Sequence, residues 1–446
     1  MKRRIFIQNS AALLSAAMIP NALKNLKPNT KLRTAHIGVG NMGFEDLKAI
    51  SSHAQVEVVA LCDVDANHLK AASELFPKAK LFKDYREMLN NHSSMIDAVV
   101  VSTPDHTHAP ASLMAMEHNK PVYCQKPLAH YVSEVRKMKD MAKEKNLVTQ
   151  MGIQVHSFYD YKLATIMIQG GVIGKVKKVI AWSNKNWGYD GQAPSGSDPI
   201  PNTLDWNLWL GTSKQREYKD GIYHPQNWRK LMDYGCATLG DMGVHIFDTP
   251  YNALNLDVPK TIKNECREPN GFGYPERNIV TYTFPGTDYT TKEMTWVWYD
   301  GVKGPEPQAE LELPNGDKLP DQGAMFIGED GRRFLLPHFM QLPKLIVNGA
   351  YQEYDISKFD PKGEMGKPVR DYAGESPKHY HQFVDACLGK GKTTAPFSYA
   401  SRLSEAILLG VIAGRFPNKT LHWDSKKAAF KEKEANQYLA GDYRKF

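Results

Sequence analysis

Short apolar runs alternate with segments of helical periodicity over the first third of the chain. The apolar runs have the length of buried strands, and the segments between them are amphipathic. The strand-like runs are 35–37, 56–62, 96–101 and 121–123, and the helical segments are 42–51, 66–75, 108–117 and 132–145. This alternation predicts a doubly wound parallel sheet with helices on both faces, in an N-terminal domain over residues 32–152.

The pattern changes near Gly152. After a helical segment at 158–169, strand-like runs are joined by long polar loops, which is typical of a largely antiparallel sheet. We therefore predict a second, α+β domain over residues 153–446 with a large, mostly antiparallel open sheet, in a chain of the α/β class. Its predicted strands are 175–182, 279–283, 293–298 and 324–327, its excursion loop is 304–323, and its late helices, 379–388 and 398–415, are candidates to pack back on the first domain.

Positive charge is concentrated at the N-terminus. The formal net charge of the whole chain is +7, but residues 1–32 hold six cations and no acid, which leaves +1 for the rest. A nearly neutral body has no excess of cations with which to neutralise phosphates. We therefore expect no nucleic-acid partner.

The first residues have the layout of an export signal. Arg3 and Arg4 precede an apolar stretch over 11–19 that is too short and too rich in alanine to span a bilayer. The pattern favours a twin-arginine signal and spacer over residues 1–31, and hence a periplasmic protein. The alternative is a basic N-terminal helical turn that stays on the protein. No later run has the length of a membrane helix, so we predict no membrane-spanning segment in the mature protein.

Cysteine and histidine positions do not suggest a metal site. The five cysteines are scattered without CxxC spacing, which argues against both zinc and a disulfide framework. Two HxH pairs, His106 with His108 and His379 with His381, lack a matching set of carboxylates. We therefore predict no bound metal.

A glycine-rich turn follows the first predicted strand. Gly38, Gly40 and Gly43 form a GxGxxG pattern at the start of a predicted helix, and Asp63 lies twenty residues further on, at the end of the second predicted strand. The glycines allow the backbone to approach a pyrophosphate at the helix N-terminus, and the carboxylate can hold a ribose diol. The combination predicts NAD. NADP is disfavoured because Asp63 would repel a 2′-phosphate and no arginine lies within 64–70.

Two further loops leave the same edge of the predicted sheet. Residues 102–104, Ser-Thr-Pro, follow a buried strand and can contact the pyrophosphate or ribose; an ordinary strand-end turn with Asp105 as a helix cap fits equally well. Lys126 follows the next strand and precedes Pro127, where an ammonium group can exchange a proton with a substrate hydroxyl. A solvated lysine at a strand end is the structural alternative.

Asp241 and His245 lie in a glycine-flanked segment over 235–248. They are four residues apart and would share one face of an α-helix. A carboxylate that orients an imidazole is a plausible proton relay.

Aromatic residues are concentrated between 182 and 228, where five of the eight tryptophans lie. Sugars present apolar C–H faces beside their hydroxyls, and aromatic rings with adjacent donors suit both. A carbohydrate is therefore the predicted substrate. The alternative is that most of these rings fill a core or a subunit contact.

Together, over about residues 32–416, these segments resemble the Gfo/Idh/MocA family of NAD(P)-dependent sugar and inositol oxidoreductases. The resemblance implies a Rossmann domain, an open-sheet domain that often builds oligomers, and hydride transfer between a ring carbon and nicotinamide. It matches Lys126 to the lysine of the family's E-K-P signature, and Asp241 and His245 to the catalytic Asp and His. Gln125 stands where that signature has a glutamate that helps orient the cofactor or the lysine.

The predicted function is oxidation of a sugar or glycoside, at the C3 hydroxyl, by an exported NAD-dependent homo-oligomer (dimer or tetramer). Two alternatives stay open: redox-neutral glycoside cleavage with tightly bound NAD, and a sugar sensor without turnover. The predicted catalytic residues are Lys126, Asp241 and His245. The predicted cofactor residues are Gly38, Gly40, Asn41, Met42, Gly43, Asp63, Ser102, Thr103, Pro104, His108, Gln125 and Lys126. The predicted substrate residues are Lys126, Gln154, His156, Trp187, Trp228, Asp241 and His245.

Overall fold

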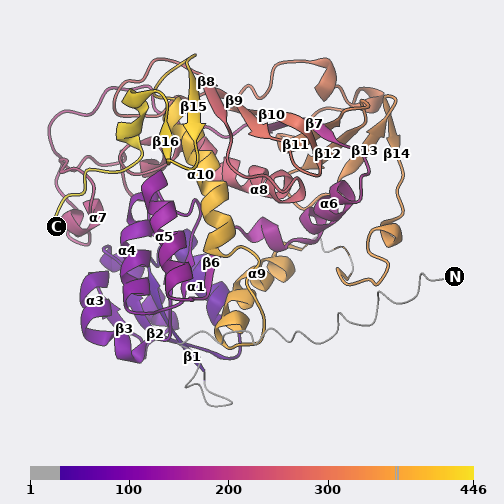
Figure 1. Ribbon diagram of the computed structural model, residues 1–446. Coiled ribbons are helices and arrows are strands. Elements are labelled where there is room, and N and C mark those ends of the chain that lie inside the picture. Colours follow the sequence, from indigo (N-terminus) through magenta and orange to yellow (C-terminus); the bar gives the residue numbers. More distant parts are fainter. Residues whose placement is uncertain (1–30, 367, 369–370) are drawn as a thin grey trace.

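Two sheets with helices packed between and around them make up the part of the chain that the computed structural model describes, residues 31–366, 368 and 371–446 (Figure 1). The predicted export signal over 1–31 lies outside the described residues except for Lys31. Among the described residues, no helix combines the length and apolarity needed to cross a membrane.

The first sheet is fully parallel, with strand order β3-β2-β1-β4-β5-β6. Its central strand β4 is completely buried, because helices cover both faces of the sheet. The predicted Rossmann sheet is therefore confirmed. The strands are β1 (Leu32–Ile37), β2 (Val56–Cys62), β3 (Lys80–Phe82), β4 (Ala98–Val101), β5 (Val122–Cys124) and β6 (Thr149–Met151), and the helices are α1 (Met42–Ser51), α2 (Ala66–Leu75), α3 (Tyr85–His92), α4 (Asp105–Glu117) and α5 (Val132–Glu144).

The second sheet has ten strands in the order β14-β13-β12-β11-β7-β10-β9-β8-β15-β16. Among its described strands only the β7–β10 pair is parallel, which confirms the mostly antiparallel sheet. Alternate residues of β9 are buried, as expected where one face packs on a core. The strands are β7 (Val176–Ser183), β8 (Thr261–Glu265), β9 (Asn278–Pro285), β10 (Thr290–Asp300), β11 (Gln322–Gly328), β12 (Arg333–Pro337), β13 (Lys344–Val347), β14 (Ala350–Gln352), β15 (Thr420–Asp424) and β16 (Ala429–Phe430).

Helices α6 (Tyr159–Gln169) and α8 (Val244–Ala253) lie under this sheet (Figure 1). The Phe247 ring of α8 stacks on Trp296 of β10 with centroids 4.1 Å apart, and both side chains are fully buried. On the opposite face, Leu311 of the excursion loop packs with Trp182 and Met325. The loop thus covers apolar sheet surface that would otherwise be exposed.

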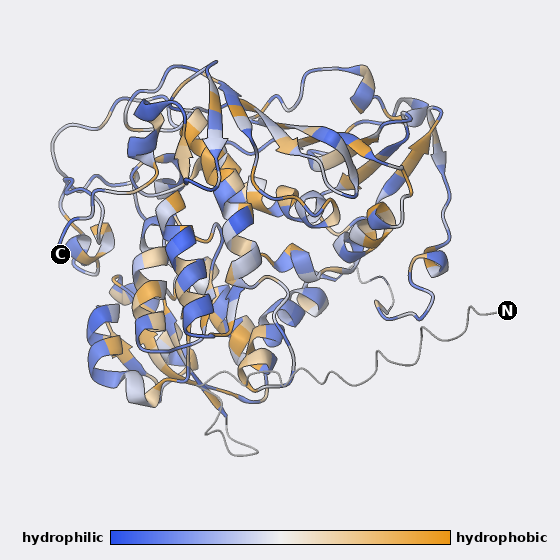
Figure 2. Ribbon diagram, viewed as in Figure 1, coloured by the Kyte–Doolittle hydropathy of each residue, from blue (hydrophilic) through white to orange (hydrophobic). Residues whose placement is uncertain are grey.

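Two late helices, α9 (Tyr372–Cys387) and α10 (Phe397–Ala413), connect the sheets. Helix α9 packs on α1, and its Phe383 shares an apolar cluster with Leu47 and Val100 of the first sheet's layer. Helix α10 contacts α5, β6, α8 and β8, so it lies against both sheets. On α5 the apolar residues Val132, Val135 and Met138 are buried, and hydrophilic residues are prominent elsewhere along the helix (Figure 2). Helix α9 begins seven residues before the predicted start because Asp371 caps it, accepting the Ala373 N–H at 3.0 Å.

Candidate active site

A cleft of about 810 Å³ runs along the carboxyl ends of the parallel strands and continues under the second sheet. Every predicted cofactor residue lines it, from the glycine turn and Asp63 to Lys126. Of the predicted substrate residues, all except His156 line it. The structure corrects the placement of His156: its Nδ1 lies 2.9 Å from the buried Asp248 carboxylate, and its ring packs against Tyr399. Asp248 and Tyr399 thus hold the His156 ring outside the lining of the cleft.

The glycine turn is packed so closely that side chains cannot enter it. A Cβ on Gly43 would lie 2.2 Å from the Gly38 carbonyl oxygen, and a Cβ on Gly38, which has φ of 81°, would lie 2.6 Å from the Ser102 carbonyl oxygen. Asp63 supports the turn, because its Oδ2 accepts the Val39 N–H at 2.9 Å. The turn and the first residues of α1 line the cleft, at the position where a helix N-terminus can hold a pyrophosphate.

Replacing Gly43 by alanine is expected to weaken NAD binding about tenfold or more, because the added carbon meets backbone that cannot swing aside. Gly391→Ala is the matched control, since a Cβ there meets nothing within 4 Å. Calorimetric titration of both variants with NAD measures the difference. Equal affinities would show that the turn does not hold the cofactor.

Lys126 and Asp241 lie together in the part of the cleft away from the glycine turn. Lys126 Nζ donates to Asp241 Oδ1 at 2.7 Å and to the Asp241 carbonyl at 3.1 Å. Asp241 Oδ2 accepts the Trp187 indole N–H at 2.7 Å, and Arg229 Nε lies 3.4 Å from Oδ1. Burial alone would raise the pKa of Asp241, but Lys126 and Arg229 outweigh it and lower the pKa below its ordinary value. Asp241 is therefore an ionised anchor that holds Lys126 at the cleft.

His245 is the second residue of α8, four residues after Asp241 in the chain. Burial, reinforced by the charge of Lys126, lowers the pKa of His245 well below its ordinary value, so the imidazole is neutral. Its Nδ1 is buried and has no hydrogen-bond partner among the described residues. Because His245 lines the cleft, its neutral imidazole can accept a proton from a bound hydroxyl through its other nitrogen, Nε2.

The predicted orientation of His245 by Asp241 differs from the structure. The hydrogen bonds of the Asp241 carboxylate go to Lys126 and Trp187, not to His245. Asp241 lies in a π-helical turn, Leu239–Gly243, before α8 begins. Residues four apart do not stack across such a turn as they do in an α-helix, which explains the difference.

The tryptophans divide between cleft and core. Trp187, Trp228 and Trp209 line the cleft, whereas Trp182 packs under the excursion loop. Trp206 stacks on Trp209 with centroids 4.7 Å apart. Both predicted substrate tryptophans therefore lie at the cleft, and the remaining rings mainly build its walls.

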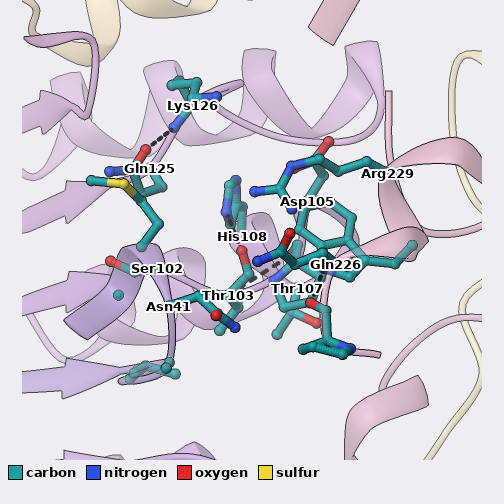
Figure 3. A pocket seen from close by; sticks show the side chains of 18 of the residues that line it. Asn41, Ser102, Thr103, Asp105, Thr107, His108, Gln125, Lys126, Gln226 and Arg229 are labelled. Carbon is teal, nitrogen blue, oxygen red and sulfur yellow. Dashed lines mark hydrogen bonds between the residues drawn. The ribbon is translucent and has the colours of Figure 1, made fainter. Parts of the chain in front are cut away.

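Sequence reasoning missed several lining residues. Arg229 packs over the Trp228 ring, 4.3 Å from its centroid, and Asp105 lies near it in the cleft (Figure 3). Adjacency to Trp228 was the one sequence signal for Arg229. Others come from distant segments, so no local spacing reveals them; they are Phe158, His338, Phe339 and Tyr372.

Asp105 begins α4 and is almost fully buried. Burial raises its pKa to about 7, although Arg229 and Lys126 oppose the shift, and Asp241 adds to it. The alternative in which Asp105 caps the helix differs from the structure, because Pro104 is at the cap position and Asp105 is the first residue of α4.

Asp105→Asn is expected to gain stability over the wild type as pH rises. The unfolded chain ionises this carboxyl near pH 4, whereas the folded chain does so only near pH 7. The free energy of unfolding of the wild type therefore falls as the pH rises from about 4 to about 7. Asp105→Asn has no carboxyl at this position, so it does not show this loss. The difference in unfolding free energy should grow by about 2–3 kcal/mol between pH 5 and pH 8. Urea titrations at both pH values measure it, and a constant difference would contradict the assignment.

One group of described residues brings three potential metal-ligand atoms within 4.8 Å of one another: Asp65, His68 and His224. Each already has a protein partner. Asp65 Oδ1 caps α2 and its Oδ2 lies 3.1 Å from His224 Nε2, while His68 Nδ1 lies 3.4 Å from Asp63. These contacts account for the arrangement without an ion, and the expectation of no metal stays a prediction.

A Rossmann domain whose nucleotide cleft ends at a lysine, a carboxylate and an imidazole defines the class of dinucleotide-dependent oxidoreductases. Residues 32–153 match the oxidoreductase family's NAD-binding Rossmann fold, and residues 161–271 match the C-terminal alpha/beta domain of the same family. The chain belongs to the Gfo/Idh/MocA oxidoreductase family.

Curated relatives match over about a third of the chain or less. Inositol 2-dehydrogenase of Salmonella typhimurium is 29% identical over 148 residues, which are 32% of this chain and 43% of that protein. A glycosyl hydrolase family 109 protein of Stenotrophomonas maltophilia is 34% identical over 134 residues, 28% of this chain and 29% of that protein. The chain thus matches less than half the length of each.

Solved structures match over both domains. Levoglucosan dehydrogenase in complex with NADH and levoglucosan has a TM-score of 0.62 at 16% identity, covering 88% of this chain and 99% of that one. An oxidoreductase domain protein from Kribbella flavida has a TM-score of 0.62 at 18% identity, covering 89% of this chain and 100% of that one. At these identities the likeness shows the shared fold.

Proposed function

We propose that the protein is an NAD-dependent oxidoreductase that oxidises a ring hydroxyl of a sugar or glycoside. The observation that carries the proposal is the Lys126–Asp241 pair beside the neutral His245, in the cleft that begins at the glycine turn. A binding protein needs no proton-transfer set beside its cofactor, so this cluster argues against a sugar sensor.

The cleft fits NAD. The glycine cradle admits backbone contact with a pyrophosphate, and Asp63 directly follows β2, where its carboxylate suits a ribose diol. No arginine within 64–70 offers a site for a 2′-phosphate, which favours NAD over NADP. When bound, NAD supplies the hydride acceptor.

The chain's own residues would handle the proton. Neutral His245 accepts the proton of the substrate hydroxyl, while the Lys126 ammonium donates a hydrogen bond to the oxygen on which negative charge develops. Asp241 keeps Lys126 in place, since its Oδ1 accepts from Nζ at 2.7 Å. The surrounding protein buries this group and strengthens its interactions.

The aromatic lining supports a carbohydrate substrate. Trp187 and Trp228 offer rings for C–H faces, and Arg229, Gln154 and Asp241 offer polar partners for hydroxyls. The inositol and levoglucosan dehydrogenases among the relatives are named for cyclic polyols or sugars. We place the reaction at the C3 hydroxyl, in an exported, periplasmic homo-oligomer; the arginine pair at residues 3 and 4 supports export.

Redox-neutral glycoside cleavage is the second candidate, favoured by the match to a glycosyl hydrolase family 109 protein. Oxidation at one carbon acidifies the adjacent C–H, which permits elimination before the hydride returns. A periplasmic protein has little free NAD available, and such a cycle needs none.

Purified protein incubated with NAD and a panel of glycosides distinguishes these functions. Net oxidation gives the absorbance of reduced nicotinamide and a keto-sugar by mass spectrometry. Redox-neutral cleavage gives sugar fragments without reduced cofactor. Binding without either product would overturn the proposal in favour of a sensor.

A further inference from the structure

A fully buried carboxylate lies directly behind the cofactor cleft. Asp46, in the second turn of α1, has no exposed surface and does not line the cleft itself. Three neutral side chains donate hydrogen bonds to it: Ser102 Oγ at 2.6 Å, Tyr380 Oη at 2.7 Å, and Gln125 Nε2 at 2.9 Å to both oxygens. Burial raises the pKa of Asp46 to about 6 despite these bonds, so an ionised carboxylate here reduces stability at neutral pH.

The three donors to Asp46 come from three separate segments of the chain. Two of them line the cleft, and the third contacts a residue that does. Ser102 follows β4 and Gln125 follows β5, and both line the cleft. Tyr380 lies on α9, and its hydroxyl accepts the Gln154 amide at 2.8 Å. Gln154 lines the cleft as well. Asp46 therefore fixes three lining side chains from behind, one of them through Tyr380.

The carboxylate also determines which way the Gln125 amide points. A carboxylate only accepts hydrogen bonds, so it selects the amide nitrogen of Gln125 and turns Oε1 away. That oxygen accepts the Lys126 backbone N–H at 3.1 Å (Figure 3). The amide occupies space that Gly152 leaves open, because a Cβ at that position would lie 2.8 Å from the Gln125 side chain. The chain of contacts thus runs from Asp46 to the backbone that carries the active lysine.

We propose that Asp46 is a positioning residue of the reaction: it sets Ser102, Gln125 and Gln154 along the cofactor cleft and, through Gln125, places Lys126. This inference rests on the proposed NAD-dependent function. Asp46 touches neither cofactor nor substrate, and its effect is transmitted through the side chains that do.

The pairing predicts a reciprocal exchange. In Asp46→Asn, either the new amide nitrogen faces the Gln125 amide nitrogen, or Gln125 turns and directs its NH₂ at the Lys126 N–H. In Gln125→Glu, two carboxyl groups meet within hydrogen-bond distance and compete for one proton.

The double variant, Asp46→Asn with Gln125→Glu, exchanges the two groups. The amide oxygen now at position 46 takes the place of Oδ1 and accepts from Tyr380. Its NH₂ group, in the place of Oδ2, donates to the carboxylate now at position 125 and to the Ser102 hydroxyl, which turns to accept. The same carboxylate accepts from the Lys126 N–H. The hydrogen bond between positions 46 and 125 is thus restored, with one buried charge as in the wild type.

The test measures NAD affinity by calorimetry, kcat for sugar oxidation, and the melting temperature without ligand, for the wild type, both single variants and the double variant. We expect each single variant to lose about tenfold in NAD affinity or kcat, and the double variant to return to within about threefold of wild type. Glu74→Gln, at an exposed position of α2, is the control for loss of a carboxylate.

The outcomes are distinct. Single variants that keep wild-type affinity and kcat overturn the inference. So does a double variant that regains its melting temperature but not its affinity or kcat, because Asp46 would then be structural only. If the wild type itself fails to bind NAD, the proposed function fails first, and the inference fails with it.

Discussion

Lys126→Met is expected to reduce kcat for sugar oxidation by about 10³-fold, with NAD affinity changed by less than about tenfold. Methionine has nearly the length of the lysine stem but neither donates to a developing alkoxide nor carries charge. The loss also leaves Asp241 with Arg229 and Trp187 as its remaining partners. The expected loss of kcat therefore has two causes: the ammonium donor is removed, and Asp241 loses the partner that it held.

Steady-state kinetics with saturating glycoside, together with NAD titration, measure this change. Lys137→Met on the exposed face of α5 is the matched control and should retain wild-type rates. A Lys126→Met protein that keeps more than about a tenth of the wild-type kcat would rule out a direct chemical role for this lysine.

His245→Asn is expected to reduce kcat by about 10²-fold to 10³-fold, because the carboxamide cannot take up the hydroxyl proton. The affinity for NAD should stay close to that of the wild type, since the glycine turn and Asp63 are unchanged. Folding should also be retained, because Nδ1 of His245 makes no hydrogen bond to the described residues that the substitution would break.

The pH profile of the reaction provides a second measurement for His245. If the imidazole is the base, the pH dependence of kcat in the wild type should disappear in the variant. His118→Asn, at the end of α4, controls for loss of an imidazole elsewhere. An unchanged pH profile in His245→Asn would assign the base to another group.

Local motifs predicted the parts of the site that are local in the chain. The glycine turn, Asp63 and Lys126 each follow a strand of one sheet, and parallel strands bring their carboxyl ends to one edge. The spacing of the strands and glycines was therefore enough to predict that these residues lie at the same edge of the sheet. These residues line one cleft, as that geometry requires.

Contacts between residues that are distant in the chain could not be predicted from local sequence patterns. Nothing near Asp46 in the sequence indicates that Tyr380, which lies on a helix near the far end of the chain, donates to it. The spacing of Asp241 and His245 predicted a contact that the structure does not contain, because Asp241 lies in a π-helical turn. The residue types alone do not indicate such a turn. His156 does not line the cleft, and its partner Asp248 lies 92 residues further along the chain, so no local spacing reveals the pair.

Helix α9 ties the end of the chain to its beginning. Its Tyr380 ring stacks on Tyr123 of β5 with centroids 5.3 Å apart, and Phe383 and Val384 complete the apolar layer over the first sheet. A fragment ending near residue 152 would leave that layer bare to water. The nucleotide-binding domain is therefore not self-sufficient: a hybrid enzyme that contains it would also have to contain helix α9, although that helix is distant in the sequence.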